Sequence, residues 1–281
     1  MTLEIQRDKA NAFRKMHDRS RILVLANAWD VASVRIVEQA GFPAIATTSA
    51  GVAWSLGYPD GEGLGREEML SVVRRVAARV AVPVTADMVA GFGSKAADVA
   101  ETVRSLIAVG AVGMNMEDGT DDEYGTLVEA AVQVEKVRAA REAATAAGVP
   151  IVINARTDVY LAKVGEPASC LRNAVERANA YREAGADCLF VPGVRDADTI
   201  AKLVREINGP INILAAGTAP SIPELEQMGV ARVSLGSGPM AATLGVLKKI
   251  LEEIRGPGTY QTINQNAVTY AEMNRLMTRP P

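Results

Sequence analysis

Pro83-Val-Thr-Ala-Asp87 and Val112-Gly-Met-Asn-Met-Glu-Asp118 are short apolar stretches that each stop at a carboxylate, one strand-helix unit apart along the chain. Apolar runs of this length are typical of buried strands in parallel α/β proteins. Such proteins carry their chemistry at the carboxyl ends of the strands. Two neighbouring acidic strand ends therefore predict a metal site.

Outward from these two stretches, strand-type runs alternate with amphipathic helical stretches, which is typical of βαβ units and a parallel sheet. The expected strands are 22–27, 44–49, 83–88, 112–118, 150–157, 188–193, 211–216 and 232–236. The expected helices include 30–40, 66–80, 95–109, 127–147, 171–184, 198–207 and 223–228. Eight cycles predict a (β/α)8 TIM barrel, and the lack of a GxGxxG fingerprint after the first strand disfavours a dinucleotide-binding doubly wound sheet.

The whole chain, residues 1–281, is expected to form one domain. An N-terminal helix within residues 1–20 should cover the bottom of the barrel, which spans residues 22–255. A C-terminal extension, 256–281, should contain a helical stretch near 269–277. Long loops are expected at 50–65 and 119–125, where glycine-rich segments could close over a substrate.

Composition restricts the class of partner. The 281 residues are 48% hydrophobic, and 30 basic residues stand against 33 acidic ones without blocks of either sign. This balance gives no reason to expect a nucleic-acid or membrane partner, so a small soluble substrate is expected. Cys170 and Cys188 form no disulfide or zinc pattern, and the charged N-terminus resembles no signal peptide, so we expect a reducing, cytoplasmic setting.

The strand ends supply a set of polar residues that should converge on the barrel mouth. They are Ser49, Asp60, Asp87, Asn115, Glu117, Asp118, Asn154, Arg156, Asp158 and Asn212. Several carboxylates with one arginine fit Mg2+ or Mn2+ holding an anionic substrate that Arg156 grips in a bidentate manner. Since the only histidine, His17, is expected far from the mouth, acid-base work would fall to carboxylates, metal-bound water, Tyr58 or Tyr124.

These residues also have structural interpretations. Asp87 and Glu117 could cap helices or pair with Arg156, and Arg156 with Asp158 could form a structural ion pair. Asp60 could be a turn residue. Asn212 could be a satisfied polar residue of the core. Spacing alone does not decide between these interpretations.

Motifs along the chain resemble those of the isocitrate lyase and phosphoenolpyruvate mutase superfamily, in the short branch that includes methylisocitrate lyase and phosphonopyruvate hydrolase. The resemblance spans about residue 10 to about residue 255 and occurs in the family's order. It rests on Asn27-Ala-Trp-Asp30, Thr48-Ser-Ala-Gly51, Leu56-Gly-Tyr-Pro-Asp60, Ala86-Asp87 with Gly91-Phe-Gly93, Asn115-Met-Glu-Asp118, Asn154-Ala-Arg-Thr-Asp158 and Ala184-Gly-Ala-Asp187.

The resemblance implies a barrel whose last helix is exchanged between subunits, commonly in a dimer of dimers, hence a homotetramer. It also implies Mg2+, with Asp87 as the direct ligand and Asp60 and Glu117 in the water-mediated shell. Ser49, the backbone around Ala50 and Gly51, and Arg156 would bind the substrate carboxylate. Asn212 would match a substrate-contacting asparagine if Gly217 to Pro220 anchors the alignment.

Two departures from the family pattern bear on the chemistry. Val89 stands where the family usually has a second acid after Asp87, which should weaken the metal site, since loss of an outer-shell ligand typically costs about 10 to 100-fold in affinity or activity. The loop 119–125 lacks the cysteine and histidine that the true lyases carry there. Cleavage of isocitrate or methylisocitrate by the usual mechanism is therefore not expected.

The resulting hypothesis is a Mg2+-dependent lyase that cleaves a carbon-carbon bond of a small 2-oxo or 2-hydroxy carboxylate through a metal-stabilised enolate. Arg156, Glu117 and Tyr58 are the expected catalytic residues, and Asp87 is expected to take part in substrate binding. The alternatives are carbon-phosphorus chemistry on phosphonopyruvate, as mutase or hydrolase, and a catalytically weak metabolite-binding member of the family.

Overall fold

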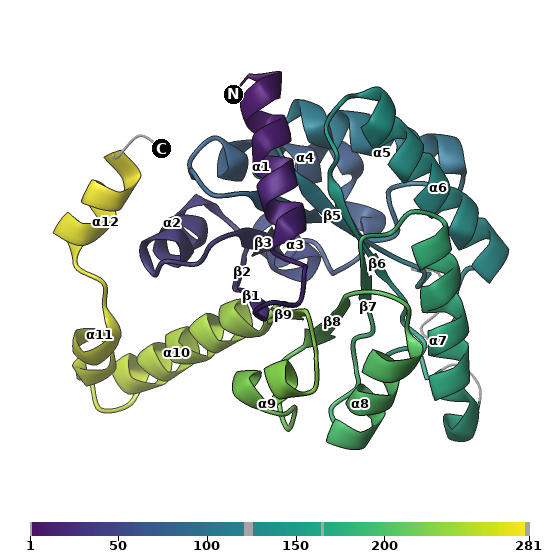
Figure 1. The fold of residues 1–281 in the computed structure, drawn as a ribbon. Coiled ribbons are helices and arrows are strands. Elements are labelled where there is room, and N and C mark those ends of the chain that lie inside the picture. Colours follow the sequence, from purple (N-terminus) through teal and green to yellow (C-terminus); the bar gives the residue numbers. More distant parts are fainter. Residues whose placement is uncertain (1, 121–125, 164–165, 279–281) are drawn as a thin grey trace.

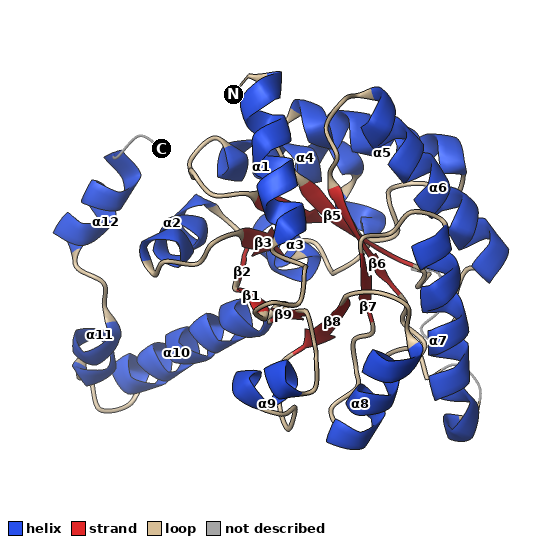
Figure 2. Ribbon diagram, in the orientation of Figure 1, coloured by secondary structure: helices blue, strands red, loops and turns tan. Residues whose placement is uncertain are grey.

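The computed structural model describes residues 2–120, 126–163 and 166–278. In this part of the chain, nine parallel strands form one sheet in the order β1-β9-β8-β7-β6-β5-β4-β3-β2, which Figure 2 shows at the centre of the molecule. The strands are β1 (Leu23–Leu25), β2 (Asn27–Ala28), β3 (Ile45–Thr47), β4 (Val84–Asp87), β5 (Gly113–Glu117), β6 (Val152–Arg156), β7 (Cys188–Phe190), β8 (Ile211–Leu214) and β9 (Arg232–Ser234).

The sheet curls into a barrel whose two ends meet within the first predicted strand. β1 pairs with β9, while β2 pairs with β3. The two short strands are consecutive in the chain and are separated only by Ala26. The predicted strand 22–27 is thus one strand interrupted at a single residue, and the eight-stranded (β/α)8 interpretation is confirmed.

Most of the helices surround the sheet (Figure 1), and they mostly agree with the predicted ranges to within a few residues. None of those in the described part of the chain has the length and apolar character needed to span a membrane. They are α1 (Leu3–Lys15), α2 (Val31–Gln39), α3 (Ser49–Leu56), η1 (Glu62–Leu64), α4 (Arg66–Ala77), α5 (Ala96–Ala108), α6 (Ala130–Ala146), α7 (Pro167–Glu183), α8 (Ala197–Glu206), α9 (Ile222–Gln227), α10 (Gly238–Arg255), α11 (Gln261–Asn266) and α12 (Tyr270–Thr278).

The loop predicted at 50–65 is wrong in its first half, because α3 fills it and η1 follows. The Thr48 side chain accepts a hydrogen bond from the Gly51 N–H and so caps α3. Gly57 ends the helix in the left-handed conformation, with φ of 86°, which glycine adopts at little cost. The first turn of α3 is buried, so its apolar face is too broad to give the usual helical alternation. The other predicted loop, 119–125, lies mostly outside the described residues.

Helix α1 covers the amino-terminal end of the barrel, as predicted. Gln6 Nε2 donates to the carbonyl oxygens of Ile107, at 2.7 Å, and Ala111, at 3.0 Å, just before β5. Phe13 is fully buried on the inward side of this helix. The helix ends at Lys15, earlier than expected, and His17 follows it as a buried residue at the bottom of the barrel.

The barrel interior is polar near its middle. Asn154 Nδ2 donates to Asn115 Oδ1 at 2.8 Å, and Arg232 Nη2 donates to the same oxygen at 3.3 Å. Asn212 and Ser234 bond to each other at 3.3 Å. All five residues are 5% exposed or less.

Candidate active site at the carboxyl ends of the strands

The strand ends bring the predicted acids and arginine together at one mouth. β5 and β6 are paired in register so that Glu117 lies opposite Arg156, and both strands end there. A cavity of about 310 Å³ opens above these two residues. It is lined by Asp60, Gly61, Glu117, Gly119, Thr120, Thr126, Arg156, Asp158, Leu161 and Ala162.

Arg156 is the central cation of this mouth. Its Nε donates to Asp158 Oδ1 at 2.5 Å, and its Nη2 donates to Asp158 Oδ2 at 2.9 Å. Its Nη1 lies 2.7 Å from Glu117 Oε2 as an ion pair, although that oxygen has no aligned hydrogen bond. A guanidinium has five N–H groups, so three remain outside the bonds to Asp158. The predicted ion pair with Asp158 is therefore present, and the arginine keeps donors for a substrate carboxylate.

Phe190, which the sequence analysis did not single out, fixes the plane of this guanidinium. The Arg156 carbon Cζ lies 5.9 Å from the centroid of the Phe190 ring, a cation-π geometry. Phe190 ends β7 in register with Arg156, which ends β6. It lies in the middle of the predicted strand 188–193, so the sequence carried no signal for its place at the mouth.

The electrostatics of the mouth favour a proton on Glu117. Burial raises the pKa of Glu117 well above its usual value, and the nearby charges of Asp158, Asp87 and Asp60 add to the rise, while Arg156 opposes it. For Arg156, burial alone would lower the pKa, but the charges of Glu117 and Asp158 outweigh this and raise it. The arginine stays charged, and Glu117 can exchange a proton at a higher pH than an ordinary glutamate.

Asp87 ends β4 against the start of α3. The Ser49 N–H, in the first turn of that helix, donates to Asp87 Oδ2 at 3.0 Å. Ala50 and Gly51 complete this buried turn, whose positive end favours anions. A side chain at Gly51 would meet the Thr48 methyl at 2.6 Å, so only glycine fits. The predicted grouping of Ser49 to Gly51 with Asp87 is present.

Asp60 stands at the rim of the mouth as an exposed residue. Desolvation of its carboxyl raises its pKa, and the charge of Asp87 contributes further, while the Ser49 hydroxyl bonds to it and opposes the rise. Its carboxyl therefore faces Ser49 and Asp87, and the turn interpretation does not exclude a role in the site.

The three predicted metal-shell acids fit an ion that keeps most of its water. Among residues 2–120, 126–163 and 166–278, no three acidic, cysteine or histidine side chains are clustered closely enough to ligate one ion directly. Asp87 Oδ1, however, is buried and has no hydrogen-bond donor within that part of the chain. Mg2+ commonly binds through one or two carboxylates and several waters. Asp87 can supply the direct ligand, with Asp60 and Glu117 reached through water.

Three predicted mouth residues are buried within the barrel. Asn115, Asn154 and Asn212 belong to its hydrogen-bonded polar layer. This agrees with the structural interpretation of Asn212, the second residue of β8, as a satisfied polar residue. In the strand register Asn115 lies opposite Asp87 and Asn212 lies opposite Phe190, so the substrate-binding role of Asn212 stays a prediction.

Asp118 lies away from the mouth. Tyr181 Oη donates to its Oδ2 at 2.6 Å, and Arg177 Nη1 donates to the same oxygen at 3.1 Å, both from α7. The Asp158 N–H donates to Asp118 Oδ1 at 2.8 Å. Asp118 therefore lies outside the mouth and positions Asp158 by accepting the bond from its backbone N–H.

Of the two tyrosines named as possible acids or bases, Tyr58 alone lies in the described part of the chain. Tyr58 is exposed, two residues before Asp60, and is not among the residues that line the mouth cavity. Tyr124 lies outside the described residues. The proton donor of the site is therefore better sought among the carboxylates.

Val89, at the place of the missing second acid, is buried in a strained backbone. Its φ is 52°, a left-handed value that is rare for a β-branched residue. Met88 and Val89 are 0% and 2% exposed, so this wall of the barrel is apolar, as the sequence indicated. The Val89 carbonyl accepts from the Glu117 N–H at 2.9 Å, which joins this loop to the end of β5.

Known proteins match this chain over most of its length. A family model described as phosphoenolpyruvate phosphomutase matches residues 13–255. An oxaloacetate decarboxylase of Rhodopseudomonas palustris is 30% identical, covering 89% of this chain and 86% of that protein. A Burkholderia cenocepacia structure described as a candidate lyase/mutase superposes with a TM-score of 0.92 at 37% identity, covering 99% of this chain and 98% of that one. A phosphonopyruvate hydrolase complex with oxalate and Mg2+ gives 0.83 at 26%, covering 96% and 94%.

Proposed function

Because the chain belongs to the phosphoenolpyruvate phosphomutase family, within the isocitrate lyase and phosphoenolpyruvate mutase superfamily, we propose that it is a Mg2+-dependent lyase that cleaves a carbon-carbon bond of a small 2-oxo carboxylate. Oxaloacetate is the substrate that we favour. The observation that carries the proposal is the mouth itself, where a buried Asp87 oxygen without a donor lies near an arginine with unused donors.

The comparisons support this choice of chemistry. Superfamily members are lyases, mutases and hydrolases of small carboxylates, and one relative is named oxaloacetate decarboxylase. Another was crystallised with oxalate and Mg2+. Oxalate is a planar dianion, as is the enolate of pyruvate that forms when the C3–C4 bond of oxaloacetate breaks and carbon dioxide leaves.

Each residue of the mouth has a distinct task in this proposal. Arg156, oriented by Asp158 and Phe190, binds the carboxylate next to the oxo group through its remaining N–H groups. Mg2+, when bound at Asp87 with Asp60 and Glu117 in its water-mediated shell, would stabilise negative charge on the substrate oxygens. Glu117, whose pKa is raised by burial, can hold the proton that C3 of the product requires.

Carbon-phosphorus chemistry is the second candidate, because the matching family model is a phosphomutase and phosphonopyruvate hydrolase is structurally similar. The charge of the mouth argues against it. The carboxylates of Asp60, Asp87 and Asp158 and the buried Glu117 lie around Arg156, the one basic residue among the described residues that line this cavity. A phosphonate carries more negative charge than a carboxylate and would be repelled more strongly by this set.

The test is turnover of oxaloacetate, phosphonopyruvate and methylisocitrate with Mg2+ and with a chelator. Mg2+ alone decarboxylates oxaloacetate in solution, so rates are compared with the Asp87→Ala protein at the same metal concentration. Faster decarboxylation by the native protein alone supports the proposal, and turnover of phosphonopyruvate alone favours the second candidate. Thermal stabilisation without turnover, about 2.7 kcal/mol for a ligand at 100 times its Kd, identifies a metabolite-binding protein.

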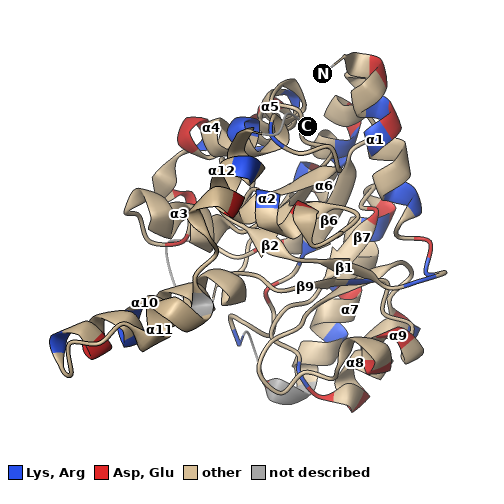
Figure 3. Cartoon of the chain, turned by 90° about the vertical axis from the view of Figure 1, so that its left-hand side faces the viewer, with Lys and Arg blue, Asp and Glu red and all other residues tan. Residues whose placement is uncertain are grey.

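We also propose that the protein is a homo-oligomer, a dimer or dimer of dimers, in which α10 packs on a second copy. Helix α10 leaves the barrel and extends away from it, as Figures 1 and 3 show from two sides. One face of α10 presents apolar residues at a helical spacing, each 40 to 55% exposed. They are Leu244, Leu247, Leu251 and Ile254.

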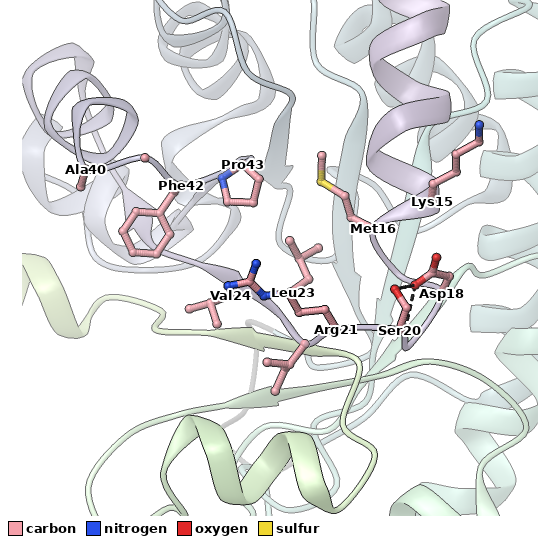
Figure 4. Close-up of a pocket in the computed structure, with 12 residues that line it drawn as sticks. Lys15, Met16, Asp18, Ser20, Arg21, Leu23, Val24, Ala40, Phe42 and Pro43 are labelled. Carbon is pink, nitrogen blue, oxygen red and sulfur yellow. Dashed lines mark hydrogen bonds between the residues drawn. The ribbon is translucent and has the colours of Figure 1, made fainter.

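The barrel has a hollow that suits such a helix. A cavity of about 490 Å³ lies against β1 and the end of α2, where Figure 4 shows Val24, Phe42 and Pro43 around it, with Met16 beside them. A closed (β/α)8 barrel carries its last helix next to the first strand. We therefore propose that α10 of a partner subunit covers this part of the wall, which would bury both apolar surfaces.

A further inference from the structure

Two loops at the mouth are tied together by one side chain. The loop before α4 carries Asp60 and then Glu62, and the loop after β4 runs from Met88 to Lys95. Glu62 Oε1 accepts a hydrogen bond from the Phe92 backbone N–H at 2.5 Å. The bond joins segments thirty residues apart. Each segment carries, or follows directly, an acid that the proposed metal site requires.

The loop after β4 needs such external support because its backbone is strained. Val89, Gly91 and Phe92 have φ of 52°, 99° and 56°. Non-glycine residues in the left-handed region are strained and persist only where neighbouring groups hold them. Thr102 Oγ1 donates to the Gly91 carbonyl at 2.8 Å from the side of α5. Glu62 binds the same loop from the side of Asp60.

Lys136 of α6 is a buried cation near the same loops. The residue is 2% exposed, and burial lowers its pKa, while the charges of Glu62 and Asp98 oppose this. A buried ammonium is costly unless acids face it. One turn earlier on α6, Gln133 Nε2 donates to the Glu117 carbonyl oxygen at 3.1 Å. The same helix therefore carries a positive charge that attracts Glu62 and a side chain bonded to the end of β5.

We propose that Glu62 and Lys136 are positioning residues, which hold Asp60 beside Asp87 by fixing the loop of one against the loop of the other. Neither residue lines the mouth cavity. The proposal rests on the proposed Mg2+ site, because it assigns the two residues to the preorganisation of that site. It adds a function for Lys136, which the proposed chemistry does not use.

The experiment compares Glu62→Met, which removes the acceptor oxygen, Lys136→Met and the double variant with the native protein. Glu67→Met is the matched control, since the Glu67 side chain is 86% exposed and belongs to the next helix. Isothermal titration measures Mg2+ binding in the presence of oxalate, and hydrogen exchange measures protection of the Phe92 amide and of the amides of residues 57–65. Thermal unfolding is followed in parallel.

We expect Glu62→Met to weaken Mg2+ binding by about tenfold or more, as for loss of an outer-shell support, and to accelerate exchange at Phe92 and in residues 57–65. Lys136→Met should do the same. The double variant should weaken Mg2+ binding little more than either single variant, because both residues are proposed to act through the same link between the loops. The control should match the native protein in every measurement.

The outcomes separate this proposal from the proposed function. If the native protein itself binds no Mg2+ with oxalate, the proposed function fails, and exchange of residues 57–65 and Phe92 alone decides whether Glu62 ties the two loops. Unchanged exchange in Glu62→Met would overturn the proposal. Faster exchange with native Mg2+ affinity, in a protein that binds the metal, would also overturn it, since the link would then be structural only.

Discussion

The Asp158 carboxylate binds Arg156 in a bidentate manner, through Nε at 2.5 Å and Nη2 at 2.9 Å. Asp158 is itself held by the bond from its N–H to Asp118. Asp158, held by Asp118, therefore orients the guanidinium before any substrate binds. This also fixes the direction of the remaining N–H groups of Arg156. Such preorganisation lowers the entropic cost of substrate binding.

Arg156→Lys should weaken binding of oxalate in the presence of Mg2+ by more than tenfold, or about 1.4 kcal/mol. Lysine keeps the charge but cannot bind Asp158 in a bidentate manner and still offer a fork to a carboxylate. Isothermal titration measures the affinity, and Arg104→Lys on the surface of α5 is the control. Native affinity in Arg156→Lys would show that the arginine only pairs with Glu117 and Asp158.

Asp87→Ala should abolish Mg2+-dependent binding of oxalate while the protein stays folded. Asp87 Oδ1 is the buried carboxylate oxygen without a donor, and its loss removes the proposed direct ligand. Circular dichroism checks the fold, and titration with and without Mg2+ measures binding. If Asp87→Ala keeps its Mg2+-dependent affinity for oxalate, Asp87 is not the direct ligand and the metal would bind at Asp60 and Glu117.

Val89→Asp should lower the maximal rate even at saturating Mg2+. Aspartate tolerates the left-handed backbone better than valine does, so the effect should come from the side chain. A new carboxylate in this apolar wall would be poorly solvated. Val89→Asn, which has the same shape without the charge, should lose less activity. Tighter Mg2+ binding with an undiminished rate in Val89→Asp would instead mean that the missing acid had only weakened the metal site.

His17 should make stability fall as the pH is lowered from 7. Burial, and then the charge of Arg232, lowers the pKa of His17 to about 3 in the folded protein, whereas an unfolded chain protonates it near 6.5. The unfolded state therefore binds more protons between these values, so stability is lost as pH falls through this window. The loss between pH 7 and pH 5 is about 2 kcal/mol.

Denaturant unfolding at several pH values tests this prediction. His17→Gln should reduce the loss of stability between pH 7 and pH 5, where most carboxylates remain ionised in both states. A native-like pH dependence in the variant would show that other groups cause the acid sensitivity.

Leu247→Glu with Leu251→Glu should shift the protein to monomers, because both side chains lie on the exposed apolar face of α10. Light scattering after size-exclusion chromatography gives the mass at several concentrations. Val132→Glu, at an exposed apolar position on α6, is the control. If the native protein is monomeric at every concentration, the proposed helix exchange is wrong.

The sequence by itself determined the barrel and the ends of its strands. Apolar runs and helical periodicity are local properties, and parallel strands must end at one edge, so the order of residues alone groups Glu117 with Arg156. Alternation along a strand could also have excluded Asp118, because neighbouring residues point to opposite faces. Asp118 follows Glu117 directly and accordingly faces α7.

Only the tertiary structure decided how deep each polar residue lies and which loops touch. Asn115, Asn154 and Asn212 were predicted for the mouth, and the packed barrel shows that all three are buried and hydrogen-bonded. The Glu62 bond to Phe92 joins distant segments through a left-handed backbone that no local pattern predicts. Depth and contact depend on how strands and loops are placed against one another, since burial and hydrogen bonding are properties of the packed chain.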